Sequence, residues 1–216
     1  MTRIKVCGIT NRQDANAAVA AGADAVGLIL AESPRRVDPS DVAGITVDVP
    51  LFVATVGVFV NARLEQIIRT MSTCGLNAVQ LHGDEDEEEA VHALGPKRVI
   101  QAVRLASLDQ IGLVAGSAAS LVLVEPLVEG VRGGSGQRLD DELARAAIAT
   151  GRPIMLAGGL SPENVYDAVV RLRPYAVDVG SGVEAAPGRK DHGKIRDFVA
   201  AVREADRVVD ADSATA

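Results

Sequence analysis

The chain has 216 residues, 48% of them hydrophobic, which fits a single domain with a sizeable core. Its net charge is −7 and its basic residues are scattered, so nucleic acid is a poor candidate partner, because a phosphate backbone needs a concentrated basic face. Cys7 and Cys74 are too few for a disulfide framework, and no apolar run is long enough to span a membrane. The N-terminus lacks the apolar core of a signal peptide, so we expect a cytoplasmic protein with reduced thiols.

Short β-branched runs alternate along the chain with Ala-rich and charged segments of helical spacing. In chain order, the expected strands are residues 3–7, 25–30, 52–60, 78–82, 98–103, 120–125, 153–157 and 176–179. The expected helices are residues 14–21, 39–45, 63–74, 85–94, 108–115, 140–149, 162–172 and 190–205. Asp38 before Pro39 is a helix start signal, whereas Gly112 and Gly116 dilute the fifth helix.

Strand–helix repeats of this kind form a parallel sheet that either closes into a barrel or stays open and doubly wound. A helix after the last strand and Gly-rich turns at the carboxyl ends of the last three strands favour closure. We predict a single (β/α)8 TIM barrel over residues 1–206, with a frayed or disordered tail over residues 207–216.

A phosphate site is predicted in the loops after the last two strands. Gly158 and Gly159 follow the seventh strand, and Ser181 and Gly182 follow the eighth. Small residues let backbone N–H groups approach an anion, and a helix N-terminus adds partial positive charge. The alternative is that these glycines serve only as tight turns. Their place in two consecutive loops at the functional end of a barrel favours a phosphorylated ligand.

Cys7 and Glu125 are the candidate catalytic residues, because each ends a strand at this same end of the barrel. Cys7 is either a buried small hydrophobe or a thiolate, with its pKa lowered by Arg35 or a helix N-terminus, that takes a proton or attacks carbon. Glu125 is either a structural ion-pair partner or, if the mouth is poorly solvated, a general acid near neutrality.

Candidate substrate contacts surround these two residues. Arg35 is either solvated or clamps a carboxylate in bidentate fashion, and His82 is either a core histidine or a substrate contact. Asp178 ends the eighth strand, and Gly133 and Gly134 follow the sixth. No His, Cys, Asp or Glu cluster has metal-ligand spacing and no nucleotide-binding loop occurs, so we predict no metal and no cofactor.

At these positions the sequence resembles the phosphoribosylanthranilate isomerase family, over about residues 3–200. The matching motifs run in family order: Lys5-Val6-Cys7-Gly8-Ile9-Thr10, Gly22-Ala23-Asp24-Ala25-Val26-Gly27, Ser33-Pro34-Arg35, Val56-Gly57-Val58-Phe59-Val60-Asn61, Val79-Gln80-Leu81-His82-Gly83, Gly133-Gly134-Ser135-Gly136, Ala157-Gly158-Gly159-Leu160 with Asn164, and Val177-Asp178-Val179 through Ser181-Gly182-Val183-Glu184.

The resemblance implies a cofactor-free step of tryptophan biosynthesis, the Amadori rearrangement of N-(5-phosphoribosyl)anthranilate to 1-(o-carboxyphenylamino)-1-deoxyribulose 5-phosphate. It implies that Cys7 is the general base, that Arg35 holds the anthranilate carboxylate and that the last two loops bind the phosphate. Where the family usually has Asp as general acid this chain has Glu125, and Ala31-Glu32 stands where the family has Lys before Ser33.

Two alternatives to this function remain open. Glu125 and Glu32 would favour a paralogous sugar-phosphate isomerase or epimerase of another pathway. The other alternative is a non-catalytic barrel that binds a phosphorylated metabolite. The expected partner is a small phosphorylated aminosugar, and the chain is expected to be a monomer or a homodimer.

Overall fold

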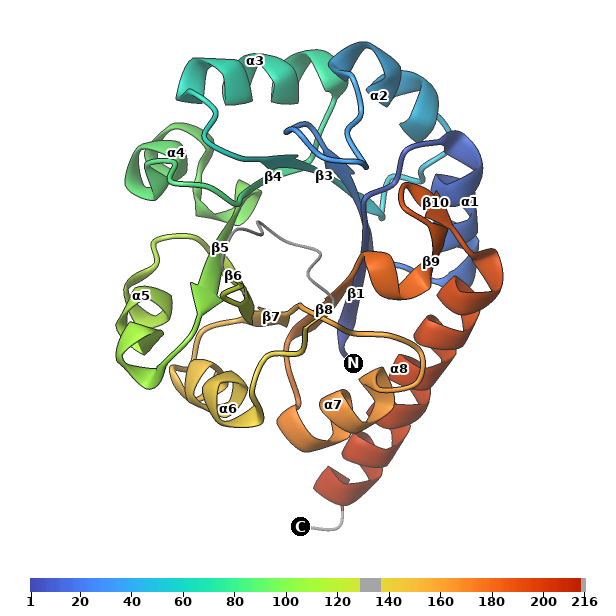
Figure 1. The fold of residues 1–216 in the computed structure, drawn as a ribbon, viewed down its shortest axis with the longest axis vertical. Helices are drawn as coiled ribbons and strands as arrows, with labels where there is room; N and C mark the ends of the chain where they lie inside the picture. The colour runs from blue at the N-terminus through green and yellow to red at the C-terminus, as the bar shows by residue number, and fades with distance from the viewer. Residues whose placement is uncertain (129–136, 215–216) are drawn as a thin grey trace.

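Eight parallel strands close into one barrel in the residues that the computed structural model describes, which are 1–128 and 137–214. Helices surround the barrel on the outside (Figure 1). The strands are β1 (Arg3–Cys7), β2 (Ala25–Ile29), β3 (Ala54–Phe59), β4 (Ala78–Leu81), β5 (Val99–Leu105), β6 (Leu121–Pro126), β7 (Ile154–Leu156) and β8 (Ala176–Val179). The α-helices are α1 (Arg12–Ala21), α2 (Pro39–Thr46), α3 (Leu64–Cys74), α4 (Glu87–Leu94), α5 (Ile111–Gly116), α6 (Asp141–Ala149), α7 (Val165–Leu172) and α8 (His192–Ala214). The predicted fold class is confirmed.

Five short elements differ from the prediction. The fifth helix begins as a 3-10 turn, η2 (Leu108–Gln110), before the brief α5, as its glycines suggested. A second 3-10 turn, η1 (Pro96–Arg98), precedes β5, and a third, η3 (Ser181–Val183), follows β8. After η3, an unpredicted antiparallel pair of strands, β9 (Glu184–Ala186) and β10 (Arg189–Lys190), lies beside the barrel mouth.

The strands alternate between two apolar cores, because successive side chains of a strand point to opposite faces. On β1, Ile4 and Val6 belong to the large core between the barrel and its helices. A smaller core fills the barrel itself, with Val56, Ile100, Leu123, Met155, Ala157 and Ala176 as its buried members. On β1, the alternation therefore directs Lys5 and Cys7 to the barrel interior.

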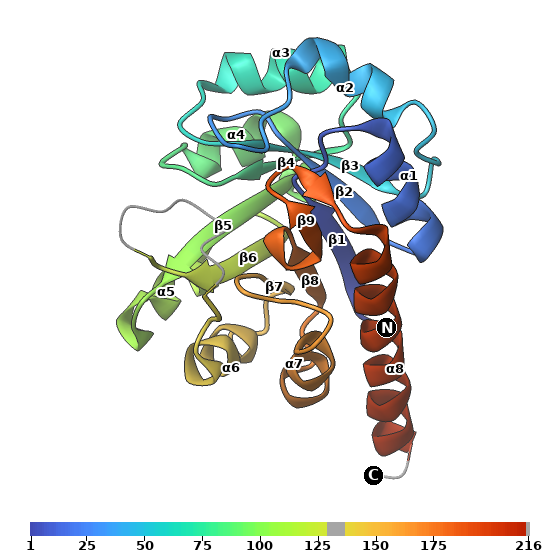
Figure 2. The ribbon, with the colours of Figure 1, turned by 45° about the vertical axis from the view of Figure 1, so that its right-hand side comes forward.

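Helix α8 fastens the end of the chain to its beginning. The Asp206 carboxylate accepts hydrogen bonds from the backbone N–H and the hydroxyl of Thr2, at 2.9 and 2.7 Å. Figure 2 shows α8 running alongside β1, with the N-terminus beside it. The tail that we expected to fray from Arg207 is instead helical through Ala214, because the buried Ala205 and Asp206 hold this part of α8 on the barrel.

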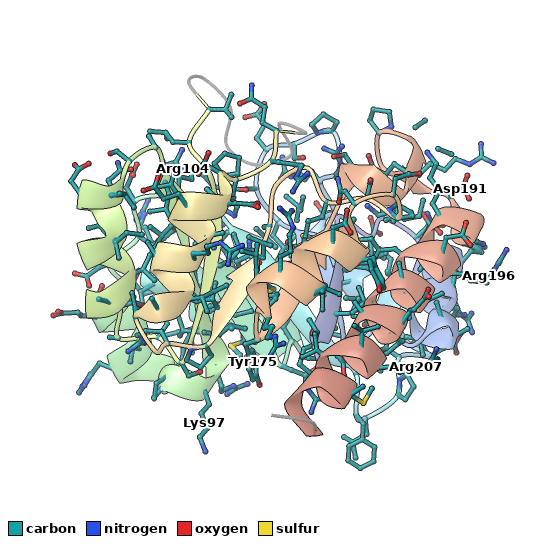
Figure 3. All side chains as sticks on the ribbon, turned by 90° about the horizontal axis from the view of Figure 1, so that it is seen from below. Lys97, Arg104, Tyr175, Asp191, Arg196 and Arg207 are labelled. Atoms are coloured by element: carbon teal, nitrogen blue, oxygen red, sulfur yellow. The ribbon has the colours of Figure 1, made fainter. Side chains whose placement is uncertain are left out.

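The two ends of the barrel carry different side chains. Figure 3 shows Lys97 and Tyr175, which precede β5 and β8, at one edge, and Arg104 and Asp191 toward the opposite edge. At the amino end, Asp24 accepts hydrogen bonds from the Arg3 guanidinium at 2.7 Å, from the Ile4 N–H at 2.9 Å and from Arg203 at 3.2 Å. The carboxyl end holds the candidate site.

Candidate active site

A pocket opens at the carboxyl end of the barrel, where functional groups of this fold gather. Every predicted site residue that the structure describes lines it: Cys7, Arg35, His82, Glu125, Gly158, Gly159, Asp178, Ser181 and Gly182. The predicted contacts Gly133 and Gly134 lie outside the described residues. The strand-end rule therefore brought together residues that are more than a hundred positions apart in sequence.

The Cys7 thiol lies at the top of β1 above a buried ion pair. Lys5, two residues earlier on the same face, donates from Nζ to Asp178 Oδ1 at 2.9 Å. The two residues are direct neighbours in the register of β1 and β8. On the neighbouring strand β2, Gly27 leaves room for the sulfur, since a Cβ atom at this position would stand only 2.8 Å from Sγ of Cys7. The thiol is thus held between a glycine and a charged pair.

Opposing effects act on the proton affinity of this thiol. Burial raises the pKa of Cys7, the positive charge of Lys5 lowers it and the carboxylate of Asp178 raises it, with a net rise above the ordinary value. For Lys5, burial alone would lower the pKa, but the negative charges of Asp178 and Cys7 outweigh burial and raise it. Lys5 is therefore charged throughout the physiological range.

The Glu125 carboxyl group lies at the end of β6 in contact with His82 of β4. Its Oε1 is 2.7 Å from His82 Nε2, and both side chains are nearly fully buried. His82 Nδ1 is 2.9 Å from the amide nitrogen of Gln80, which can only donate. With the Gln80 amide in this orientation, Nδ1 accepts from the amide and Nε2–H donates to Glu125. The second oxygen of Glu125, Oε2, takes no part in this contact.

Arg35 meets a carboxylate, but one supplied by the chain itself. Its Nε and Nη2 donate to the two carboxylate oxygens of Glu184, each at 2.7 Å. Lys190 Nζ donates to the same carboxylate at 3.1 Å. Burial raises the pKa of Glu184, but these two cations outweigh it and hold the pKa below its ordinary value. The bidentate geometry that we expected for a substrate carboxylate is taken here by Glu184, and Nη1 of Arg35 has no part in this pair.

The two predicted phosphate loops approach each other closely. Gly158 and Gly159 both have positive φ, 88° and 59°, which favours glycine. A Cβ on Gly182 would stand 1.9 Å from the carbonyl oxygen of Leu160, so only glycine fits where the loop after β8 crosses the loop after β7. Ser181 begins η3 at this point. Tight turns at two adjacent strand ends thus bring backbone groups together at one side of the pocket.

Sequence reasoning missed four polar residues of this end: Lys5, Gln80, Glu184 and Lys190. Lys5 and Gln80 carried a signal, because each is a polar residue in an apolar strand at spacing two from a candidate, Cys7 or His82. Glu184 and Lys190 had no periodic signal, since their strands are too short for such a pattern, although Glu184 ends one of the family motifs.

The described part of the chain has neither a metal-binding cluster nor a membrane-spanning helix. It contains no group of three or more His, Cys, Asp or Glu side chains placed to hold a metal ion. Of the helices that the structure describes, none has both the length and the apolar character needed to cross a bilayer.

Known proteins of one family match this chain over nearly its whole length. The family model described as N-(5'phosphoribosyl)anthranilate (PRA) isomerase matches residues 4–201. The N-(5'-phosphoribosyl)anthranilate isomerase of a Geobacter species is 47% identical over 201 residues, which is 93% of this chain and 97% of that protein. The isomerase of Pseudomonas fluorescens is 46% identical over 204 residues, 93% of this chain and 98% of that protein.

Solved structures of the same family are also similar to this chain. The phosphoribosylanthranilate isomerase of Thermotoga maritima superposes with a TM-score of 0.86 at 39% identity and covers 94% of this chain and all of that one, 100%. The isomerase of Thermus thermophilus gives a TM-score of 0.83 at 39% identity, covering 94% of this chain and 99% of that one. The resemblance seen in the motifs is confirmed, and the chain belongs to the N-(5'-phosphoribosyl)anthranilate isomerase family.

Proposed function

We propose that this chain catalyses the Amadori rearrangement of N-(5-phosphoribosyl)anthranilate in tryptophan biosynthesis, with Cys7 as general base and Glu125 as general acid. Membership of the isomerase family supports the reaction. The observation that carries the assignment of roles is that the thiol, the carboxyl group and the two Gly-rich loops line one pocket. A related solved structure holds reduced 1-(o-carboxyphenylamino)-1-deoxyribulose 5-phosphate, an analogue of the product.

The reaction begins with a proton from Glu125 to the ring oxygen of the ribose, which opens the ring as the nitrogen lone pair forms an iminium. His82 supports this role, because its Nε2–H holds Oε1 by a hydrogen bond and leaves Oε2 to carry the proton. Burial of the carboxyl group excludes bulk water, which would otherwise compete for that proton.

The second step removes the proton at C2′. The Cys7 thiolate takes this proton, and the C–H electron pair forms the enolamine double bond while neutralising the iminium. The enolamine then tautomerises to the ketone: the thiol returns a proton to C1′, and the C2′ hydroxyl gives its proton to the Glu125 carboxylate, which restores both residues. Cys7 is near Lys5, whose charge stabilises the thiolate form. No cofactor enters these steps, because only protons move.

The remaining residues bind the substrate. We assign the phosphate to the backbone N–H groups of Gly158, Gly159, Ser181 and Gly182. We assign the anthranilate carboxylate to Nη1 of Arg35, because Glu184 occupies the Nε–Nη2 edge of the guanidinium. Asp178 lines the pocket and is the proposed acceptor for a ribose hydroxyl.

Assembly and location extend this proposal. A related structure describes monomers generated from a dimeric isomerase of Thermotoga maritima. Here the adjacent side chains of Leu51 and Phe52 are 87% and 94% exposed, which supports a homodimer over a monomer, because a second copy would bury this apolar pair. The free thiols support a reducing, cytoplasmic location. Analytical ultracentrifugation of the chain and of Phe52→Ser tests the assembly.

Turnover of the fluorescent substrate tests the function. We expect purified protein to consume it and the gene to restore growth without tryptophan to cells that lack the isomerase. Activity on another aminoaldose or on a ribulose phosphate, with none on the anthranilate compound, would instead indicate the paralogous enzyme. Calorimetric binding without turnover of either compound would indicate the non-catalytic barrel.

A further inference from the structure

Lys5 is a buried cation in the barrel interior, next to Ala25 and Asp178 in the strand register. Its side chain is only 3% exposed. An ammonium group taken out of water is costly unless it is paired, and replacing a buried ion pair by apolar residues often costs nothing. Stability alone therefore gives no reason for a lysine at this position.

The position of Lys5 relative to the thiol suggests a reason. Lys5 and Cys7 are on the same face of β1, one above the other, because they are two residues apart in a strand. Both reach the same glycine of β2: a Cβ on Gly27 would stand 3.1 Å from Cε of Lys5 and 2.8 Å from Sγ of Cys7. The missing side chain of Gly27 is what lets the lysine extend toward the sulfur.

Among the described residues, each charged group that acts on Cys7 has an identified partner. From β8, Asp178 accepts the Lys5 hydrogen bond. Lys190, from the segment after β8, and Arg35, from the loop after β2, also act on the thiol, but both share the carboxylate of Glu184. Removing the charge of Lys5 would therefore leave the Asp178 carboxylate uncompensated beside the sulfur and change the local charge from neutral to negative.

We propose that Lys5 is a positioning residue that holds a positive charge beside the Cys7 sulfur and so keeps a thiolate available to take the C2′ proton. This inference deepens the proposed function and rests on it for the role of the thiolate. The thiolate takes the proton and becomes a thiol, the electron pair of the C–H bond goes to the iminium, and Lys5 keeps its own proton throughout.

The test is a titration of the thiol in the substrate-free protein, which does not depend on turnover. Cys74→Ser serves as the background, so that Cys7 is the single thiol, and thiolate absorbance in the ultraviolet or the rate of alkylation by iodoacetamide is followed against pH. Three variants are compared on this background: Lys5→Met, Asp178→Asn and both together. Circular dichroism and a thermal melt check that each is folded.

The two single variants are expected to act in opposite directions. Lys5→Met should move the Cys7 titration to higher pH by about one pH unit or more, because an opposite charge a few ångströms away is lost. Asp178→Asn should move it to lower pH, and the double variant should titrate near the background. A packing defect would not reverse its sign between the two variants.

Failure of the inference and failure of the proposed function are distinguishable. An unchanged titration in Lys5→Met, or a shift of Asp178→Asn to higher pH, overturns the role of Lys5 whatever the turnover. If Lys5→Met does not fold, the direction found for Asp178→Asn alone decides. If the titrations shift as expected but the background protein turns over no substrate, the charge assignment holds and the proposed reaction is wrong.

Discussion

The two ends of the barrel use the same kinds of charged residue to different effect. At the amino end, Asp24 binds Arg3 and Arg203 close to solvent, and the Arg3 side chain is 64% exposed. At the carboxyl end, the ion pairs Lys5–Asp178 and Arg35–Glu184 and the hydrogen-bonded pair His82–Glu125 are largely buried around one pocket. Exposed ion pairs contribute modestly to stability, whereas buried ones mainly set proton affinity and geometry. We expect substitutions at the amino end to change stability and those at the carboxyl end to change turnover.

The largest effect is expected at the thiol. Cys7→Ser should lower kcat by about 100-fold to 10,000-fold, because a serine hydroxyl of nearly the same size does not ionise near neutrality. Stopped-flow fluorescence of the substrate measures the rate, and urea unfolding should show a stability close to that of the parent. Cys74→Ser is the matched control and should keep full activity. A rate for Cys7→Ser above a tenth of the parent's would exclude Cys7 as the base.

The second largest loss of kcat is expected for substitutions of Glu125. Glu125→Gln removes the acidic proton and should lower kcat by about 100-fold or more. Glu125→Asp keeps the acid but withdraws it by about 1.5 Å from His82 and should lose less, roughly tenfold. Steady-state kinetics of both variants decides. An equal loss of kcat in Glu125→Gln and Glu125→Asp would mean that Glu125 does not act as the general acid.

A substitution of Gly182 should affect both stability and substrate binding, although the residue lies at the carboxyl end. In Gly182→Ala the new methyl group would meet the Leu160 carbonyl, so the loop must shift. We expect KM to rise about tenfold or more and the free energy of unfolding to fall by about 1–3 kcal/mol. Gly112→Ala is the control, since nothing lies within 4 Å of a methyl group there. A normal KM for Gly182→Ala would mean that this loop does not bind the phosphate.

The smallest effect is expected at the amino end, in Asp24→Asn. Burial raises the pKa of Asp24, but the hydrogen bonds from Arg3, Ile4 and Arg203 outweigh it and lower the pKa below its ordinary value. The carboxylate therefore stabilises the fold above the ordinary pKa of an aspartate, and this is lost as pH falls through the lowered value. At pH 7 the variant should lose about 1–2 kcal/mol, with kcat unchanged.

Urea unfolding of Asp24→Asn and the parent across pH checks this prediction. Their difference in free energy of unfolding should be constant near neutrality and shrink in acid. A difference that grew on acidification, or a loss of turnover at pH 7, would contradict the separation of the two ends.

The sequence predicted most of the fold because its strands are continuous β-branched runs. β1 and β8 have the predicted limits, since Cys7 is followed by a glycine and Val179 by another. The extension of α8 past Arg207 was missed because it depends on Asp206 meeting Thr2, which lies at the other end of the chain. Local composition carries no information about that contact.

The site residues likewise fall into those that local sequence could predict and those that depend on contacts between distant parts of the chain. Cys7, His82 and Glu125 were predictable as strand ends, which the repeating fold places together. The partner of Arg35 was not, because Glu184 reaches it from an element 149 residues away. Lys5 could have been noticed as a charge in an apolar strand, but its pairing with Asp178 depends on the register that closes the barrel.

The hydrogen bonds between Thr2 and Asp206 also affect how the chain folds during translation. The two residues are 204 positions apart, so β1 leaves the ribosome long before the helix that fastens it exists. Until β8 and α8 follow, one edge of β1 has no partner strand and its interior charge no counterion. Final closure is therefore an event of the completed polypeptide, and nascent chains expose an open sheet edge that chaperones can recognise.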